Sequence, residues 1–168
     1  MPLLVLVRHA KAEAPQAGLD DHGRALTLEG REASVRLAER LVAAGIVPDL
    51  ALVSSSNRTV QTLKRMATVL GEAPMRVEDD LYESAGERYL SVLTSAGDAK
   101  VVLVVGHEPT TSHVAAWLAG PGSMKRPLQK VAQGMTTSGA AILEYDGAWA
   151  ELDHRSARLV DVIDGKVS

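Results

Sequence analysis

The sequence predicts an α/β fold in which helices cover a mostly parallel β-sheet. Two apolar runs, Leu3 to Val7 and Val101 to Val105, carry most of this prediction. Neither run alternates with polar residues, which is typical of strands that are buried on both faces of a parallel sheet. Stretches with helical periodicity separate these runs from weaker strand candidates, and this alternation also favours an α/β layered domain.

The length and composition indicate one domain that spans residues 1–168. A chain of 168 residues with 46% hydrophobic content can bury one core and is short for two. The net charge of -3 and the lack of a Lys or Arg run argue against nucleic acid or a membrane surface as a partner. We therefore expect a monomer that acts on small or protein-borne partners.

The sequence contains no cysteine, which excludes disulfides, thiolate nucleophiles and cysteine-based zinc sites. The two strand-like runs have five residues each and no apolar run exceeds six, whereas a membrane-spanning helix needs roughly 18 or more. No basic segment precedes Leu3 to Val7, so this run does not have the pattern of a signal peptide. We expect a cytoplasmic protein.

The first half of the chain is expected to contain a loop and one helix before the second strand. Ala12 to Arg24 combines Pro, Gly and Asp residues without periodicity, which is typical of a loop. Thr27 can cap a helix that starts at Leu28 and stops at Gly45. The apolar face of this helix is expected to comprise Ala33, Leu37, Leu41 and Ala44.

The second strand, Leu50 to Val53, leads into another helix through the polar segment Ser54 to Arg58. Ser56 or Asn57 can cap this helix, and Gly71 ends it. Its apolar stripe is expected to comprise Val60, Leu63, Ala67 and Leu70. Arg58 therefore lies in the first helical turn.

The elements beyond residue 71 continue the alternation. They are, in order, a weak strand at Arg76-Val77, a helix from Glu87 to Ser95, the strand Val101 to Val105 and a helix from Thr110 to Leu118. Ser123 to Thr137 is expected to be irregular. Ala140 to Tyr145 and Trp149 to Leu152 are expected to form a closing hairpin around Asp146-Gly147.

Chemically active side chains follow three of the predicted strands. Arg8 and His9 come directly after the first strand, Arg58 opens the helix after the second, and His107 follows Val101 to Val105. Because loops at the carboxyl ends of parallel strands build the ligand crevice of an open α/β sheet, these side chains should meet at one edge.

The residue types at this edge favour a phosphoryl group. Two guanidiniums can hold such a group bidentately, and the amino end of the Arg58 helix adds positive charge. A neutral histidine can attack phosphorus and carry the phosphoryl group covalently. Arginines and a protonated second histidine can neutralise the oxygens, so we expect neither a metal nor a cofactor.

Three motifs stand at these strand ends: Arg8-His9-Ala10, Ser54-Ser55 with Arg58-Thr59-x-Gln61-Thr62, and Gly106-His107-x-Pro109. Together they resemble the histidine phosphatase superfamily, which is also described as phosphoglycerate mutase-like. The short length and Arg24-x-Leu26-Thr27-x-x-Gly30 resemble SixA-type phosphohistidine phosphatases within it. The resemblance covers nearly the whole chain and implies a three-layer α/β/α fold.

The resemblance also implies roles for individual residues. It implies that His9 is the phosphoryl acceptor, that Arg8 and Arg58 clamp the phosphate, and that His107 is a further phosphate ligand. Arg24 can join them from the loop. Glu83 falls where larger members have an acid, a position that SixA-type members do not reliably keep. The departures from the common pattern are Ala10 for glycine, and Ser56 and Ala25 for proline.

We therefore expect a metal-independent phosphatase that forms a phosphohistidine intermediate and acts on phosphohistidine in a protein. A phosphomonoesterase of the same superfamily that acts on a small phosphorylated substrate is one alternative. A catalytically weak phosphate-binding or phosphoprotein-binding module is another. The sequence contains neither the G-x-S-x-G elbow of serine hydrolases nor a P-loop.

The other histidines and both tryptophans are expected to have ordinary structural roles. Asp20-Asp21-His22 could contribute to a metal site with His9, but a polar loop cluster of this kind is usually solvated. His22, His113 and His154 are expected on the surface or on helices. Trp117 and Trp149 are expected to pack in the core or the hairpin.

Overall fold

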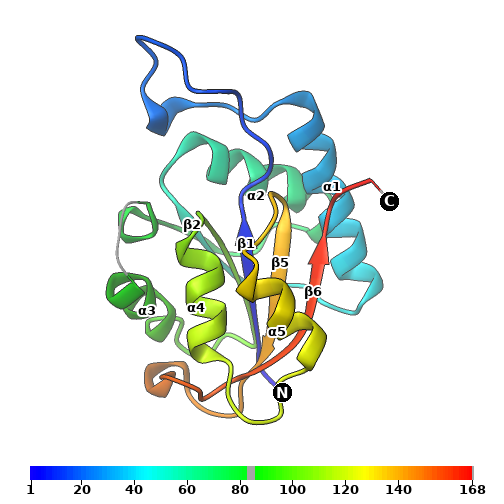
Figure 1. Cartoon of the computed structure of the whole chain (residues 1–168), viewed down its shortest axis with the longest axis vertical. Helices are drawn as coiled ribbons and strands as arrows, with labels where there is room; N and C mark the ends of the chain where they lie inside the picture. The colour runs from blue at the N-terminus through cyan, green and yellow to red at the C-terminus, as the bar shows by residue number, and fades with distance from the viewer. Residues whose placement is uncertain (83–85, 168) are drawn as a thin grey trace.

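A mixed β-sheet forms the centre of the protein (Figure 1). The computed structural model describes residues 1–82 and 86–167, and within these ranges six strands pair in the order β3-β2-β4-β1-β5-β6. The strands are β1 (Leu3–Arg8), β2 (Leu50–Ser54), β3 (Met75–Glu78), β4 (Val101–Gly106), β5 (Gly139–Glu144) and β6 (Arg158–Asp164). The pairs β1·β4, β2·β4 and β2·β3 are parallel, whereas β5 runs antiparallel to β1 and β6.

Helices cover both faces of this sheet, so the predicted three-layer α/β/α fold is confirmed. The α-helices of the described residues are α1 (Leu28–Ala43), α2 (Asn57–Leu70), α3 (Gly86–Thr94), α4 (Thr110–Leu118) and α5 (Lys125–Ala132). Short 3-10 helices are η1 (Asp21–Gly23), η2 (Asp79–Leu81) and η3 (Trp149–Glu151). Among the described residues, no helix is both long and apolar enough to cross a membrane.

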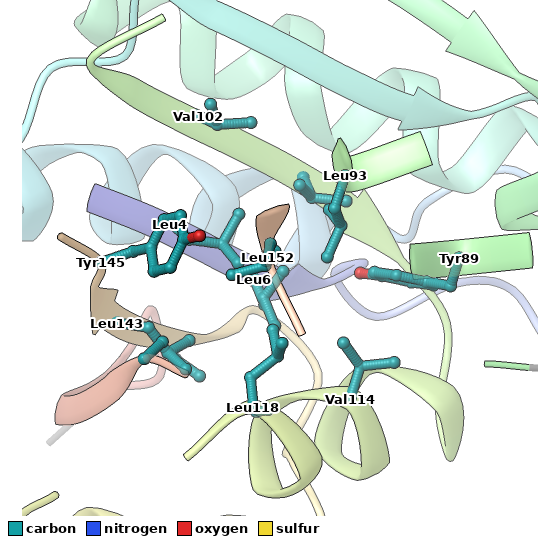
Figure 2. Close-up of a cluster of buried hydrophobic side chains, with 14 of the residues drawn as sticks. Leu4, Leu6, Tyr89, Leu93, Val102, Val114, Leu118, Leu143, Tyr145 and Leu152 are labelled. Atoms are coloured by element: carbon teal, nitrogen blue, oxygen red, sulfur yellow. The ribbon is translucent and has the colours of Figure 1, made fainter. Parts of the chain in front are cut away.

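The two faces of β1 explain its continuous apolar sequence. Leu4 and Leu6 pack in one core with α3, α4 and α5, and Figure 2 shows part of this cluster. Val5 and Val7 point to the opposite face and pack with α1 and α2. Burying one such side chain contributes about 1.5–3 kcal/mol, which is why a strand covered on both sides tolerates no polar alternation.

Two predictions about the carboxyl-terminal third were wrong. The segment 123–137 contains α5, a short amphipathic helix that buries Pro127 and Val131. Pro127 lies in the first helical turn, where proline removes no intrahelical hydrogen bond. The predicted irregular segment is therefore helical because its two buried residues are one turn apart.

The predicted hairpin also has a different second strand. Trp149 begins η3 rather than a strand, because its indole is buried and donates a hydrogen bond from Nε1 to the carbonyl of Ala99 at 2.7 Å. The strand that pairs with β5 is β6, which starts at Arg158. Trp117, which was expected to pack in the core or the hairpin, is 40% exposed on α4.

Candidate active site

The carboxyl ends of β1, β4 and β2 lie side by side, as the sheet order requires. Segment 12–24 extends beyond this edge, at the top of Figure 1. A cavity of about 330 Å3 opens here, lined by Arg8, His9, Lys11, Ala12, Arg24, Arg58, His107, Glu108 and Thr137. A larger groove of about 690 Å3 between α3 and α4 has a mostly apolar lining that contains none of the predicted site residues.

His9 is the first residue after β1, and its ring is held in one tautomer. Nδ1 lies 2.7 Å from the carbonyl oxygen of Ala10. Because a carbonyl oxygen can only accept, Nδ1 carries the proton and the neutral ring keeps a lone pair on Nε2. Burial lowers the pKa of His9 to about 4, and the positive charges of Arg58 and Arg8 act in the same direction. His9 is therefore neutral at neutral pH and available as a nucleophile.

His107 follows β4 and faces His9, with 5.4 Å between the ring centroids. Its Nδ1 accepts a hydrogen bond from Arg58 Nη2 at 3.3 Å, because a guanidinium can only donate. Its Nε2 then carries the proton and donates to Oγ of Ser54 at 2.8 Å. Burial lowers the pKa of His107 to about 3, and the charge of Arg58 contributes to this shift.

Arg58 lies in the first turn of α2, and the start of this helix is fixed to the end of β2. The Ser56 side chain caps the helix by accepting from the amide of Thr59. The Thr59 hydroxyl, which is fully buried, donates to the carbonyl of Ser54 at 2.8 Å. These contacts place the Arg58 side chain beneath the cavity, where the residue is only 6% exposed.

Two further residues of the Arg58-Thr59-x-Gln61-Thr62 motif attach α2 to the loop after β1. Oγ1 of Thr62 accepts from the amide of Ala10 at 3.0 Å. Oε1 of Gln61 accepts from the amide of Leu26 at 2.7 Å. The motif therefore holds Ala10, whose carbonyl fixes the His9 tautomer, in a constant position relative to Arg58.

Gly30 allows α1 to approach the same loop. A Cβ at this position would lie 2.1 Å from the carbonyl oxygen of Lys11. The same carbonyl accepts the amide of Thr27, whose hydroxyl caps α1. The Thr27-x-x-Gly30 spacing thus serves the close packing of α1 against the residues that follow His9.

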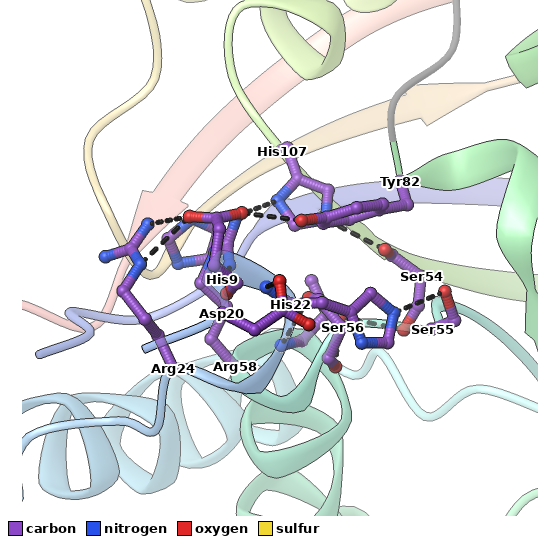
Figure 3. A network of polar contacts seen from close by, with 12 residues as sticks. His9, Asp20, His22, Arg24, Ser54, Ser55, Ser56, Arg58, Tyr82 and His107 are labelled. Carbon is purple, nitrogen blue, oxygen red and sulfur yellow. Dashed lines mark hydrogen bonds and ion pairs between the residues drawn. The ribbon is translucent and has the colours of Figure 1, made fainter. Parts of the chain in front are cut away.

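The carboxylate of Asp21, in η1, connects the arginines of the site. Oδ1 accepts from Arg24 Nε at 3.0 Å and pairs with Arg24 Nη2 at 2.8 Å. Oδ2 accepts from Tyr82 Oη at 2.6 Å and from Arg58 Nη2 at 3.2 Å. Figure 3 shows Arg24, Arg58 and Tyr82 within one network of polar contacts. The hydrogen bond from Tyr82 and the pairs with the arginines hold the pKa of Asp21 well below its usual range.

Arg8 approaches the cavity from the opposite side. Its Nη1 donates to the carbonyl of Met135 at 2.9 Å. The amide of Met135 in turn donates to Oε2 of Glu108 at 3.0 Å. Within the described part of the chain, Nε of Arg8 and Nε of Arg58 are buried without a hydrogen-bond partner. Each guanidinium therefore has one buried donor that the described residues do not use.

The structure brings Arg8, His9, Arg24, Arg58 and His107 together around one cavity, as the sequence predicted. Glu83, the sixth predicted residue, lies outside the described residues. Sequence reasoning did not identify Asp21 and Tyr82 as part of the site, and it expected His22 at the surface. His22 is half-buried and contacts Ser55 through Nε2 at 3.0 Å.

No described residues form a cluster of three or more His, Asp or Glu side chains suited to a metal ion. Asp21 in particular is turned toward arginines rather than toward His9. The arrangement that is present combines a neutral imidazole with three guanidiniums. Such a set can hold an anionic group and attack it without a proton having to be removed from the nucleophile.

Comparison with known proteins agrees with this geometry. Residues 4–90 match the model of the histidine phosphatase superfamily (branch 1). Uncharacterized protein Rv1276c of Mycobacterium tuberculosis is 36% identical over 158 residues, which cover 92% of this chain and 96% of that protein. Uncharacterized protein ML1117 of Mycobacterium leprae is 34% identical over 160 residues, which cover 92% of this chain and 96% of that protein.

Solved structures give the same result. A candidate phosphohistidine phosphatase SixA from Nakamurella multipartitia superposes with a TM-score of 0.80 at 30% identity, over 96% of this chain and 95% of that one. A similarly described SixA from Agrobacterium tumefaciens gives 0.82 at 27% identity, over 97% and 98%. The chain belongs to the histidine phosphatase superfamily and is a phosphatase. Within this superfamily it is of the SixA type.

Proposed function

We propose that this protein is a metal-independent phosphohistidine phosphatase that works through a phospho-His9 intermediate. The observation that carries the proposal is the hydrogen bond from Nδ1 of His9 to the Ala10 carbonyl, which leaves Nε2 as the lone-pair atom in a cavity with Arg8, Arg24 and Arg58. A nucleophile that is already unprotonated needs no separate base.

The first chemical step is in-line transfer to His9. The lone pair of Nε2 forms a bond to phosphorus while the bond between phosphorus and the leaving group breaks, and the leaving group departs with that electron pair. In the second step water attacks phosphorus and the N–P bond breaks. Inorganic phosphate then leaves, the proton of the attacking water passes to phosphate or solvent, and His9 is again neutral.

The positive groups of the site stabilise the transferred group. Arg8 and Arg58 are fixed by main-chain contacts at Met135 and Asp21, so they are oriented before substrate arrives. A phosphoryl dianion favours the protonated form of His107, which then donates from Nδ1. The hydrogen bond between Arg58 Nη2 and this atom is broken in that state, which frees one Nη2–H for a phosphoryl oxygen.

The carboxylates of the site support a substrate whose leaving group needs little help. Oε1 of Glu108 accepts from the amide of Ser112, and Oε2 accepts from the Ser112 hydroxyl and the Met135 amide. Asp21 is paired with two arginines. Neither described carboxylate is placed to protonate an alkoxide. Phosphohistidine leaves as neutral imidazole once solvent protonates its ring, so it suits this site better than an alkyl phosphate.

The likeness to SixA structures supports phosphohistidine in a protein as the substrate. The test is phosphate release from a phosphohistidine-bearing protein, p-nitrophenyl phosphate and a small sugar phosphate, measured side by side. We expect the highest kcat/KM with the phosphohistidine protein. A strong preference for the sugar phosphate would contradict the protein substrate and favour the small-molecule phosphomonoesterase.

The covalent step has its own test. Acid quench after mixing with radiolabelled substrate should leave label on the wild-type protein that acid slowly removes and base does not. His9→Ala should take up no label and release no phosphate, whereas His113→Ala, which changes an exposed histidine on α4, should behave like wild type. Acid-stable label on a serine would contradict the role of His9.

A further inference from the structure

The Asp21 carboxylate lies on the same donors that a phosphoryl group would use. Its two oxygens contact Arg24, Arg58 and Tyr82, and all four contacts are between 2.6 and 3.2 Å. A carboxylate and a phosphoryl group both present anionic oxygens that can accept paired hydrogen bonds from a guanidinium. In the free enzyme, Asp21 therefore provides the negative charge that bound phosphate would otherwise provide.

The geometry leaves Nη2 of Arg58 no proton for a ligand. This nitrogen has two hydrogens, and its two acceptors are Oδ2 of Asp21 at 3.2 Å and Nδ1 of His107 at 3.3 Å. Substrate can take a hydrogen bond from Nη2 only when one of these contacts is lost. A carboxylate this close to the guanidinium also offsets its charge, which weakens the attraction for a second anion.

The carboxylate is not needed to hold Arg58 in place. Nη1 of Arg58 donates to the main-chain carbonyl of Asp21 at 2.9 Å, and this contact does not depend on the Asp21 side chain. The guanidinium is also enclosed, with only 8% of the side chain exposed. Removing the carboxylate should therefore leave Arg58 oriented while it removes the competing charge.

The Asp21 side chain can move away from the arginines when a phosphoryl group binds, because it is not packed in the core. Half of this side chain is exposed, and η1 buries none of its residues. The segment is attached through polar contacts, such as Nδ2 of Asn57 to the carbonyl of Gly23 at 3.1 Å. Rotation of the Asp21 side chain toward solvent breaks no apolar packing.

We propose that Asp21 is an affinity-determining residue, a built-in carboxylate that competes with phosphate for Arg24 and Arg58 and so weakens the binding of free phosphate. This inference rests on the proposed function, because it assumes that the cavity holds the phosphoryl group. Its consequence is kinetic: the product of hydrolysis is displaced as the carboxylate returns to the arginines. Accumulated phosphate therefore inhibits turnover less than it would if Arg24 and Arg58 had no carboxylate partner.

The test measures competitive inhibition by inorganic phosphate in Asp21→Asn. We expect the inhibition constant to fall about tenfold, since the variant removes one charge-assisted competitor from the arginines. Glu144→Gln is the matched control, because this substitution also replaces a carboxylate that pairs with an arginine, Arg158. Glu144 lies beside Leu3, at the end of β1 that is opposite to the cavity. Its inhibition constant should equal that of wild type. Asp21→Ser gives a second measurement with a side chain that cannot hold the arginines.

The outcomes separate the inference from the proposed function. An inhibition constant that is unchanged or higher in both Asp21 variants, with wild type still inhibited competitively, overturns the inference and makes Asp21 a positioning residue for Arg58. Absence of competitive inhibition in wild type itself, together with activity in His9→Ala, overturns the proposed function instead.

Discussion

Nη2 of Arg58 lies 3.3 Å from Nδ1 of His107, and this contact joins the helix after β2 to the loop after β4. The direction of the hydrogen bond is fixed, because the guanidinium can only donate. A histidine that accepts from a buried cation is held in its neutral form. The free site therefore has three guanidinium charges and two neutral imidazoles.

Replacing Arg58 with alanine should lower both substrate affinity and rate, because its charge acts on the phosphoryl group in the ground state and in the transition state. We expect kcat/KM to fall by about two orders of magnitude or more, in line with the loss of one donor that stabilises developing charge. Steady-state kinetics on an aryl phosphate measures this. Arg65→Ala, which changes an exposed arginine on the same helix, is the control. An unchanged kcat/KM in Arg58→Ala would place this residue outside the site.

Activity should persist to unusually low pH for a histidine nucleophile. Burial lowers the pKa of His9 from 6.5 to about 4, and only the neutral ring can attack phosphorus. The loss of kcat/KM that protonation of His9 causes, corrected for ionisation of the substrate, should therefore be centred near pH 4 rather than near pH 6.5. A fall centred near pH 6.5 would show that His9 is not protected from protonation.

The lowered pKa of His9, which preserves activity at low pH, reduces the stability of the folded protein there. Below pH 6.5 the unfolded chain binds a proton at His9, whereas the folded protein does not until about pH 4. The unfolded state thus binds more protons in this interval, so the free energy of unfolding decreases as the pH is lowered from 6.5 to 4. Urea unfolding at pH 7 and pH 5 tests this, and His9→Gln should lose less stability over the interval than wild type.

Glu83 provides a prediction that depends on the leaving group. If it is the general acid, Glu83→Gln should slow hydrolysis of alkyl phosphates by about a hundredfold or more, since an alkoxide needs a proton to leave. Aryl phosphates should slow less, and phosphohistidine should hardly change. Initial rates on the three substrate types give the comparison. Equal losses on all three, or no loss, would favour a carboxylate that only caps or pairs near α3.

Gly30 should tolerate no side chain. A Cβ would lie 2.1 Å from the Lys11 carbonyl, so Gly30→Ala must displace either α1 or the loop that follows His9. We expect a loss of about 1–3 kcal/mol in the free energy of unfolding, which is the usual cost of forcing extra atoms into a packed interior. Gly23→Ala is the control, because a Cβ there meets nothing within 4 Å. Equal stability of the two variants in urea unfolding would contradict this account of the Thr27-x-x-Gly30 spacing.

The sequence contained enough information for most of the sheet and for most of the site. Leu3 to Val7 and Val101 to Val105 are apolar because both faces of β1 and β4 are covered, so their position in the sheet could be predicted from pattern alone. Placement of Arg8, His9, Arg58 and His107 at one edge then followed from the topology of parallel strands. These residues lie close together because β1, β4 and β2 are neighbours in the sheet and run in the same direction.

Other features depend on contacts that no local pattern encodes. Asp21 and Tyr82 lie 61 positions apart, and their hydrogen bond forms only because two separate loops fold against each other. Trp149 does not lie in a strand, because its indole donates a hydrogen bond to the Ala99 carbonyl. This buried hydrogen bond outweighs the preference of tryptophan for strands. Within the segment 123–137, α5 is helical because Pro127 and Val131 are buried, a pattern too short to separate from loop composition.

The order of strands in the sheet has a consequence for refolding. Leu3 pairs with Val101 and Leu50 with Val102, so the strands that carry the site join parts of the chain that are far apart in sequence. Closing such long loops costs entropy before any contact is gained, which makes these pairings slow steps. Helices α1 and α2 can form early without creating a cavity, whereas the ability to bind phosphate has to await the docking of β4 between β1 and β2. Recovery of activity after dilution from denaturant should accordingly lag behind recovery of the helical signal.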